Sequence, residues 1–327
     1  MKTNTLVFEN TPYSLFLYFL YDPNWEEKDY LLWGDRFTQD RLLFMKDNIK
    51  VLDYSHTLIP RLTPKFQKKP VEYIKRKWQL RNIFSKYDYC IGNAREINDP
   101  AIKIERCQIE DGIGTTHKEL VNGVKNKSFI LGLFNRLILK EPIKTSKINK
   151  IILTKNINAA IDFKDKIEIV NLEELWLSKS EQEKNKILNF FDVKISDFNQ
   201  INNSFSVLFT QPFSESRIDY SENSKIEGYK QILCKLGISE KLLVIKPHPA
   251  EKTRYRDYFP DSIIIESTFP AELMPLLGVK VNKVVTVTSS AAKSFEGKCD
   301  EIIHTKADDC FNFPKKLADG LERTVTE

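Results

Sequence analysis

The segment from Leu243 to Pro249 constrains this chain more than any other, because an apolar run leads directly into a histidine held between two prolines. The run Leu-Val-Ile-Lys is typical of a buried strand. Proline fixes its own φ angle and disfavours the helical conformation of the residue before it, so we expect His248 in an extended, preset conformation. Open α/β sheets bind ligands at the carboxyl ends of their strands. The segment therefore predicts a ligand site.

Two other segments have the same plan. Residues 107–109 run into the acid pair Glu110 and Asp111, and residues 283–288 run into Ser289 and Ser290. The sequence thus predicts three strand ends, which carry an acid pair, a histidine and a hydroxyl pair.

Strand-like runs alternate with helical stretches along both halves of the chain. The predicted strands are 5–8, 30–33, 50–54, 87–92, 107–109, 151–154 and 167–170, then 206–209, 243–246, 262–266 and 283–288. Such alternation is typical of parallel, doubly wound sheets. At 327 residues the chain exceeds the usual size of one hydrophobic core. We predict an α/β protein with two Rossmann-like domains, residues 1–195 and 196–327, facing a central cleft.

Local signals predict several helix ends. Thr11 is expected to cap a helix whose first residue is Pro12. A helix over residues 225–235 is expected to end at Gly237. The charge-rich stretch over residues 178–191 predicts one polar helix, and the Asn-rich stretch after it predicts the domain junction.

Composition and missing motifs exclude several classes of protein. The net charge of +5 is spread along the chain, which argues against nucleic-acid binding. The five cysteines are odd in number and never occur as Cys-x-x-Cys, which argues against a disulfide framework and a zinc site. Neither the glycine-rich dinucleotide fingerprint nor a P-loop occurs. The first apolar run, residues 15–21, is too short to span a membrane and lacks a cleavage pattern, so we expect a cytoplasmic protein.

The stretch over residues 129–139 leaves two interpretations open. It is apolar at helical spacing and has lysines on both sides. A helix of this kind can lie on a bilayer surface, which would place the protein peripherally at the inner face of the cell membrane. The commoner interpretation is a core helix with solvated flanks.

Each polar strand end suits a particular chemistry. A carboxylate at a strand tip can act as a general base, although an isolated acid pair is more often only a solvated turn. His248 can hydrogen-bond a phosphate and release a proton near neutral pH. Ser289 and Ser290 precede a predicted helix, where hydroxyls and free backbone amides together suit an anion. Glu272, in a short helix predicted near residues 270–277, can accept both hydroxyls of a ribose.

The order of these motifs resembles that of the bacterial sialyltransferases. An acid pair before a glycine in the first domain is followed in the second by Lys-Pro-His-Pro, Pro-Ala-Glu and Ser-Ser. This set is similar to glycosyltransferase family 52, which includes capsule enzymes, and the resemblance covers most of the chain in order. It implies the two-domain GT-B fold, CMP-sialic acid as the donor, and a glycan with a terminal galactose or similar sugar as the acceptor.

By this resemblance Glu110 is the base that removes the proton from the acceptor hydroxyl, and Asp111 is its neighbour. His248 is the acid that hydrogen-bonds or protonates the departing CMP phosphate. The residues expected to bind CMP are Ser289 and Ser290 at the phosphate, Glu272 at the ribose, and Lys246 with the surrounding backbone at Pro249 along the nucleotide. Glu215, at another predicted strand end, is the reserve candidate for the base, because related enzymes do not all take the base from the same loop.

No metal ion and no cofactor other than the donor substrate is expected. Asp-x-Asp, the usual carboxylate arrangement for a divalent ion on a sugar diphosphate, does not occur. A departing nucleoside monophosphate gains one negative charge, which a histidine, two hydroxyls and a helix N-terminus can stabilise. Single displacement would invert the anomeric carbon. The expected partners are a nucleotide-sugar donor and a glycan or lipid-linked oligosaccharide acceptor.

Two other functions remain open. Lys-Pro-His-Pro also occurs in CDP-glycerol-type glycerophosphotransferases and related capsule transferases with a similar fold. A non-catalytic protein that binds nucleotide sugars would keep the fold and make the acid pair and the histidine incidental.

Overall fold

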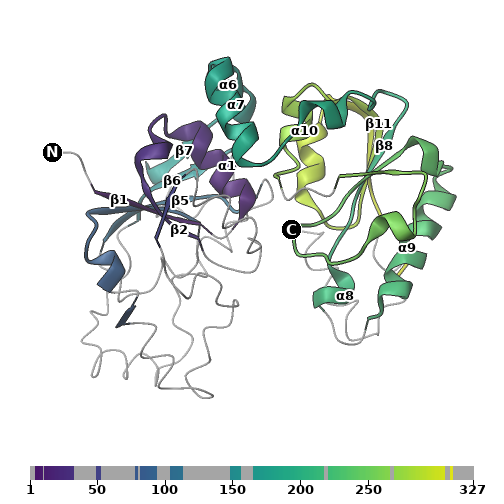
Figure 1. Cartoon of the computed structure of the whole chain (residues 1–327), viewed down its shortest axis with the longest axis horizontal. Coiled ribbons are helices and arrows are strands. Elements are labelled where there is room, and N and C mark those ends of the chain that lie inside the picture. Colours follow the sequence, from purple (N-terminus) through teal and green to yellow (C-terminus); the bar gives the residue numbers. More distant parts are fainter. Residues whose placement is uncertain are drawn as a thin grey trace. The chain divides into compact units, whose positions relative to one another are not determined.

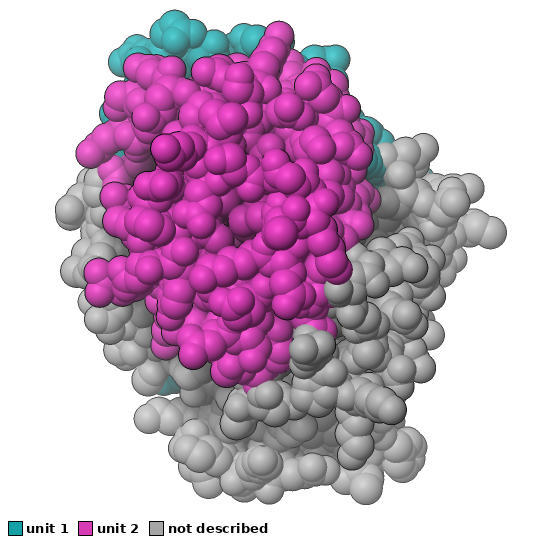
Figure 2. Space-filling model, turned by 90° about the vertical axis from the view of Figure 1, so that its right-hand side faces the viewer, with its two compact units in different colours: residues 1–190 teal, residues 191–327 magenta. Residues whose placement is uncertain are grey.

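The structure is a computed structural model. It describes residues 4–9, 11–32, 49–52, 78–79, 82–93, 104–112, 148–155, 165–216, 220–265, 269–305 and 310–311. The chain forms two compact units, Met1–Phe190 and Phe191–Glu327, which Figure 2 shows in different colours. Residue 195 is the last residue of the predicted first domain. In the structure it is the first residue of the 3-10 helix η4 (Ile195–Phe198) in the second unit.

The first unit is built on a seven-stranded sheet in which all neighbouring strands are parallel (Figure 1). Across the sheet the strands are β3 (Lys50–Val51), β2 (Asp29–Leu32), β1 (Thr5–Glu9), β4 (Tyr89–Gly92), β5 (Glu105–Ile109), β6 (Ile148–Leu153) and β7 (Ile167–Ile169). The chain moves outward from β1 on one side and from β4 on the other. Ligands bind to such sheets at this switch point, so the carboxyl ends of β1 and β4 mark the expected site.

The second unit repeats this plan with five parallel strands. Across the sheet they are β10 (Ile263–Ile264), β9 (Leu243–Lys246), β8 (Ser206–Phe209), β11 (Val281–Thr286) and β12 (Cys299–His304). Its switch point lies between β8 and β11. The predicted strands of both halves are confirmed within the described residues, with shifts at their ends, and residues 33, 53, 54 and 266 of these predictions lie outside the described residues. The sequence did not reveal β12, because its acidic residues at the sheet edge interrupt the apolar pattern.

Helix α1 (Pro12–Tyr21) begins as predicted and packs into the core of the first unit. The Thr11 side chain accepts a hydrogen bond from the backbone N of Ser14 at 3.3 Å, and Pro12 occupies the first turn. The ring of Phe16 lies 6.3 Å from that of Trp176 in α6 (Leu172–Ser178), and the ring of Phe19 lies 4.7 Å from that of Phe190 in α7 (Glu181–Phe190). Aromatic contacts therefore hold α1 against both later helices.

The helix predicted over residues 178–191 is confirmed as α7, which begins three residues later than predicted, whereas α6, which ends at Ser178, was not predicted. Lys179 is extended, with φ −75° and ψ 138°. The Glu183 carboxylate accepts hydrogen bonds from the backbone N of Ser180 at 2.9 Å and from its hydroxyl at 2.7 Å, while the Ser180 hydroxyl accepts one from the backbone N of Glu183 at 3.3 Å. This reciprocal capping box starts a new helix.

The helices of the second unit are mostly short. Among the described residues they are α8 (Phe213–Ser216), α9 (Glu222–Lys235), α10 (Leu273–Leu276) and, besides η4, the 3-10 helices η5 (Glu240–Leu242), η6 (Tyr255–Asp257) and η7 (Ser290–Phe295); the described part of the first unit also contains η1 (Trp25–Glu27). The predicted stop of α9 is confirmed, since Gly237 has φ +64° just beyond it.

Gly92 allows β4 to approach β1 closely at the switch point of the first sheet. Its φ angle is +149°, and a Cβ atom at this position would lie 2.0 Å from the backbone oxygen of Phe8. Any other residue would force the two strands apart. Because the strands stay close, Asn93 lies next to Glu9 at the carboxyl edge.

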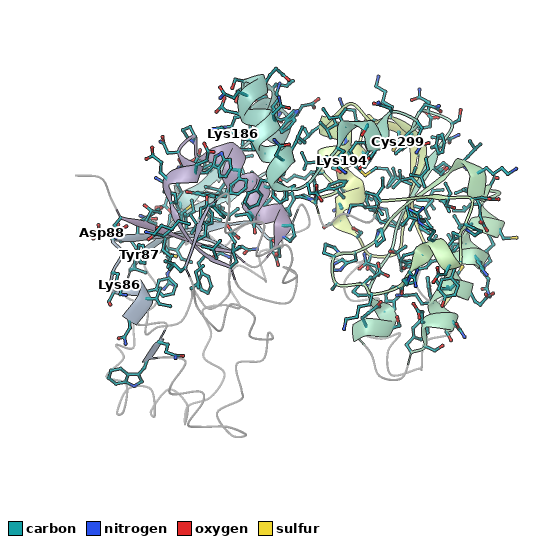
Figure 3. All side chains as sticks on the ribbon, in the orientation of Figure 1. Lys86, Tyr87, Asp88, Lys186, Lys194 and Cys299 are labelled. Carbon is teal, nitrogen blue, oxygen red and sulfur yellow. The ribbon has the colours of Figure 1, made fainter. Side chains whose placement is uncertain are left out.

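The opposite edge of this sheet is closed by contacts among loops and strand starts. Asn4 Nδ2 donates to the backbone oxygen of Lys86 at 2.7 Å, and the backbone N of Asp88 donates to Asn4 O at 2.9 Å. The hydroxyl of Tyr87 donates to Asp29 Oδ2 at 2.7 Å. Figure 3 labels Lys86, Tyr87 and Asp88 beside the start of β4. The carboxyl edge carries the candidate functional residues instead.

Among the helices within the described ranges, none is both long and apolar enough to cross a bilayer. The stretch over residues 129–139, for which the sequence leaves a bilayer-surface helix and a core helix open, lies outside the described residues.

Candidate functional site

At the carboxyl edge of the first sheet, polar residues follow or end four adjacent strands. Glu9 ends β1, Asn93 follows β4, Glu110 follows β5 and Thr154 follows β6. Glu110 belongs to the predicted acid pair. The other three were not singled out by sequence, although Asn93 and Thr154 show the same signal, a polar residue directly after an apolar strand.

Glu110 is almost completely enclosed, with 3% of the residue exposed. Its carboxylate accepts hydrogen bonds from the hydroxyl of Tyr13 and from the backbone N and the hydroxyl of Thr154, the last two at 2.9 and 2.5 Å. Burial raises the pKa of the Glu110 carboxyl, and the hydrogen bonds from Thr154 and Tyr13 partly oppose this shift. A carboxylate with a raised pKa in a fixed position is suited to accept a proton.

Asp111 is more accessible than Glu110 and has a different hydrogen-bond partner. Its Oδ1 accepts a hydrogen bond from Asn93 Nδ2 at 2.9 Å, and the same amide group donates to Thr11 Oγ1 at 3.0 Å. The two adjacent acids thus have different partners. The more enclosed member is fixed by Tyr13 and Thr154, and the other is tied to the switch point by Asn93.

Glu9 is a third carboxyl group at this edge, and none of it is exposed. Its Oε2 accepts hydrogen bonds from the Ser14 hydroxyl at 2.5 Å and from the backbone N of Asn93 at 3.2 Å, while Oε1 is buried with no hydrogen-bond partner. Burial raises the pKa of Glu9 well above its usual value, and the negative charge of Asp111 adds to the shift. Burial thus raises the pKa of two carboxyl groups at this edge, those of Glu9 and Glu110.

The predicted histidine and serines lie beyond one row of strand ends at the carboxyl edge of the second sheet. Lys246, Phe209, Thr286 and His304 are register partners across β9, β8, β11 and β12. His248 lies two residues beyond this row after β9, and Ser289 lies three residues beyond it after β11. Both flank the strand end at Thr210, next to the switch point.

The ring of His248 has a defined orientation. The backbone N of Ala250 donates to its Nδ1 at 3.1 Å, so Nδ1 acts as an acceptor. A neutral ring in this state carries its proton on Nε2. The residue is half-buried, and its Nε2 hydrogen is the one that can be donated to a ligand.

Ser289 caps the short helix η7, as predicted. Its backbone N donates to Thr286 Oγ1 at 2.9 Å, and its hydroxyl accepts from the backbone N of Ala291 at 3.3 Å. Ser290 is the first residue of η7 and is half-buried. The two hydroxyl groups stand at the start of a helical turn beside the switch point.

Lys246 and Glu272 are both buried, which the sequence did not reveal. Lys246 has 3% of its surface exposed, and its Nζ lies 4.6 Å from the centre of the Phe269 ring. Burial lowers the pKa of Lys246 to about 8, against the attraction of the Glu272 and Glu251 charges. Pro249 continues the His248 turn and is half-buried.

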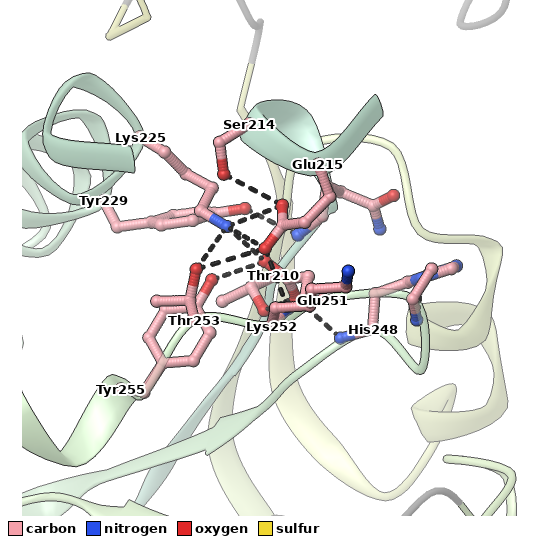
Figure 4. Close-up of polar contacts among 12 residues, drawn as sticks. Thr210, Ser214, Glu215, Lys225, Tyr229, His248, Glu251, Lys252, Thr253 and Tyr255 are labelled. Atoms are coloured by element: carbon pink, nitrogen blue, oxygen red, sulfur yellow. Dashed lines mark hydrogen bonds and ion pairs between the residues drawn. The ribbon is translucent and has the colours of Figure 1, made fainter. Parts of the chain in front are cut away.

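Glu215, the reserve candidate for the base, lies in α8 and is occupied by other contacts. Both carboxylate oxygens accept hydrogen bonds from Lys225 Nζ at 3.0 Å, and the backbone N of Lys252 donates at 2.9 Å (Figure 4). Burial acts to raise the pKa of Glu215, but the contacts with Lys252 and Lys225 hold it below its usual value. A carboxylate held in this way is a weak proton acceptor.

Of the site residues that the sequence predicts, the acid pair belongs to the first unit and the others belong to the second. In the part of the chain that the structure describes, no group of three or more His, Cys, Asp or Glu side chains is arranged to hold a metal ion.

Comparison with known proteins gives both a family and a fold. The sequence model of glycosyltransferase family 52 matches residues 104–306. An uncharacterized protein of Haemophilus influenzae is 33% identical over 249 residues, which cover 75% of this chain and 74% of that protein.

Two solved structures resemble the whole chain. The GT-B domain of a sialyltransferase from Photobacterium damselae is 13% identical, with a TM-score of 0.57 and coverage of 98% of this chain and 97% of that one. The 2,6-sialyltransferase of Photobacterium sp. JT-ISH-224, in a ternary complex with CMP and lactose, is 13% identical, with a TM-score of 0.60 and coverage of 98% and 75%. At this identity the likeness establishes the GT-B fold.

Proposed function

The chain belongs to glycosyltransferase family 52, and we propose that it is a sialyltransferase which moves sialic acid from CMP-sialic acid to a terminal galactose-type sugar. The acceptor would be part of a bacterial capsule or another surface glycan, free or linked to a lipid. The solved neighbours that share the fold include a 2,6-sialyltransferase bound to CMP and lactose. Fold likeness alone does not carry the proposal, since one fold hosts many reactions.

The observation that carries it is the set of polar groups at the carboxyl edge of the second sheet. His248 with an Nε2 proton, and the hydroxyls of Ser289 and Ser290, all follow strands that flank or adjoin the switch point. Neutral donors of this kind suit one phosphate group whose charge grows as the bond to sialic acid breaks. We assign His248 to protonate or hydrogen-bond that phosphate and the two serines to bind it.

The remaining roles complete a single displacement. The acid pair Glu110 and Asp111 would remove the proton from the acceptor hydroxyl, which attacks the anomeric carbon while CMP departs. The bond from the acceptor oxygen forms as the bond to the phosphate oxygen breaks, and the configuration inverts. Glu272 would bind the ribose, and Lys246 and Pro249 would lie along the nucleotide. No metal ion is assigned a role.

The decisive experiment combines donor choice with metal removal. The full chain, incubated with CMP-sialic acid and lactose in excess EDTA, is expected to produce sialyl-lactose and CMP, both measured by mass spectrometry. His248→Ala should lower the rate about a hundredfold or more, which is the usual size of a general-acid contribution. The matched control is His304→Ala, which removes an exposed histidine at the end of β12 and should leave the rate unchanged.

Three results would reject the proposal. Transfer from CDP-glycerol in place of CMP-sialic acid would identify a glycerophosphotransferase, for which Lys246, Lys252, Arg254 and Lys293 could bind the additional phosphate. Activity that EDTA abolishes and Mg²⁺ restores would contradict the metal-independent mechanism. Binding of CMP-sialic acid without transfer to any galactose-containing acceptor would indicate a non-catalytic binding protein.

A further inference from the structure

One buried carboxylate, that of Glu251, holds the turn that presents His248. Its Oε2 accepts hydrogen bonds from the backbone N of His248 at 2.7 Å and from the hydroxyl of Thr210. Its Oε1 accepts from the hydroxyl of Tyr255 at 2.6 Å and from Lys225 Nζ at 3.2 Å (Figure 4). Glu251 thus joins the histidine turn to the end of β8, to η6 and to α9.

The partner of this carboxylate is an equally enclosed lysine. The Lys225 side chain is 0% exposed and that of Glu251 is 1% exposed. Lys225 Nζ also contacts both oxygens of Glu215 at 3.0 Å and the hydroxyl of Thr253 at 2.7 Å. A buried ion pair of this kind contributes little net stability, but removal of one partner leaves an unpaired buried charge. The arrangement therefore fixes geometry more than it strengthens the fold.

The fixed geometry bears directly on the histidine ring. Glu251 binds the backbone N of His248, while the backbone N of Ala250, in the same turn, binds His248 Nδ1. If the turn shifts, the second contact is lost, and with it the preference for a proton on Nε2. The carboxylate thus acts on the ring through the backbone, without touching it.

We infer that Glu251 and Lys225 are positioning residues for His248, which keep the Nε2 hydrogen of its ring directed at the leaving phosphate. This inference rests on the proposed function. Neither residue belongs to the motifs that carry the family resemblance, and neither has a part in the transfer itself. Their loss should therefore slow the chemical step more than it weakens CMP binding.

The primary test is Glu251→Gln. The glutamine keeps the size of the side chain, but its NH₂ group replaces one of the two carboxylate oxygens. That NH₂ group then faces two hydrogen-bond donors, from which the replaced oxygen accepts hydrogen bonds in the unchanged protein. We expect the turnover number to fall about tenfold or more, because small misplacements of a catalytic group are costly, while the affinity for CMP measured by calorimetry changes by less than about twofold, as for a group that acts only in the transition state. The matched control is Glu227→Gln, which breaks the exposed ion pair with Lys230 on α9.

A second readout does not depend on activity. The ¹⁵N chemical shifts of the His248 ring, assigned by comparison with His248→Ala, report which nitrogen carries the proton. In the unchanged protein we expect the Nε2-protonated form, and in Glu251→Gln a mixture of both forms. If the protein transfers no sialic acid, the proposed function fails, but the ring shifts still decide whether Glu251 orients the histidine.

The inference is rejected if Glu251→Gln leaves both turnover and ring shifts unchanged, or if activity falls only in proportion to unfolded protein measured by circular dichroism. Should Glu251→Gln fail to fold, Thr210→Val decides the question. It removes one donor to Glu251 Oε2 with little change of shape, and we expect a smaller change of turnover and ring shifts in the same direction. Unchanged values in that variant would reject the inference.

Discussion

The two sheets share a strand order, but the carboxylates at their carboxyl edges are held in different ways. In the first unit Glu9 and Glu110 accept hydrogen bonds from hydroxyl and backbone N–H groups, and burial raises the pKa of both. In the second unit Glu215 and Glu251 share the buried ammonium group of Lys225. Topology therefore decides where a site can lie, whereas the buried partners decide how each carboxylate is held.

This difference suits a division of roles between the units. A carboxyl group with a raised pKa is the better proton acceptor. A turn fixed by an ion pair, with neutral donors directed outward, is the better site for a phosphate. Variants of the first edge should therefore affect proton removal, and variants of the second should affect the nucleotide.

The largest expected effect concerns the acid pair. Comparing Glu110→Gln with Asp111→Asn should show which of the two acids is the base. The variant that removes the base should lower the transfer rate about a hundredfold or more. CMP affinity, measured by calorimetry, should stay unchanged in both. Glu105→Gln is the matched control, because Glu105 is exposed at the opposite end of β5.

The comparison would break if Glu215→Gln abolished transfer while both variants of the acid pair stayed active. The base would then belong to the second unit, and the raised pKa of Glu110, which burial causes, would have no part in catalysis.

A smaller effect is expected for the serine pair. Ser289→Ala combined with Ser290→Ala should weaken CMP binding between about fivefold and a hundredfold, because each lost hydrogen bond contributes roughly 0.5–1.5 kcal/mol. The backbone amides at the start of η7 remain. The control is Ser294→Ala, whose hydroxyl donates to the backbone oxygen of Ala291 at 2.6 Å. Unchanged CMP affinity in the double variant would place the phosphate elsewhere.

The smallest effect concerns Glu9 and appears in stability. Its folded pKa lies above the unfolded value, so the folded state binds the proton more tightly. Stability from this group is fully present below the unfolded pKa and is lost as the pH rises through the folded value. Glu9→Gln, which imitates the protonated acid, should raise the melting temperature at pH 8 by a few degrees and make less difference at pH 4.

Thermal unfolding followed by circular dichroism between these pH values measures the effect, with Glu105→Gln as the control. A difference between Glu9→Gln and the unchanged protein that does not vary with pH would show that the pKa of Glu9 is the same in the folded and unfolded states. The contrast between the two edges would then lose one of its two supports.

The sequence by itself determined most of the elements, although not α6 or β12, and it placed polar residues at the ends of strands. Thr11 and Pro12 start α1, Gly237 ends α9, and the apolar run before Pro247 forms β9, because capping, backbone φ preferences and apolar patterning act over a few residues. The same local signals located His248, Ser289 and the acid pair at strand ends. The capping box that starts α7 also lies within a few residues of sequence.

Only the tertiary structure decided which of these residues meet and in what charge environment. Glu9 contacts Asn93 across 84 positions of the sequence, and Lys225 reaches Glu251 across 26. The first contact depends on the close approach of β1 and β4 at Gly92, and the second depends on how α9 packs beside the turn after β9. No local pattern indicates that a lysine in the charged helix α9 is completely buried, or that a carboxyl group beside it holds the histidine turn. Burial and pairing arise from distant parts of the chain, and they set the proton affinities on which the chemistry depends.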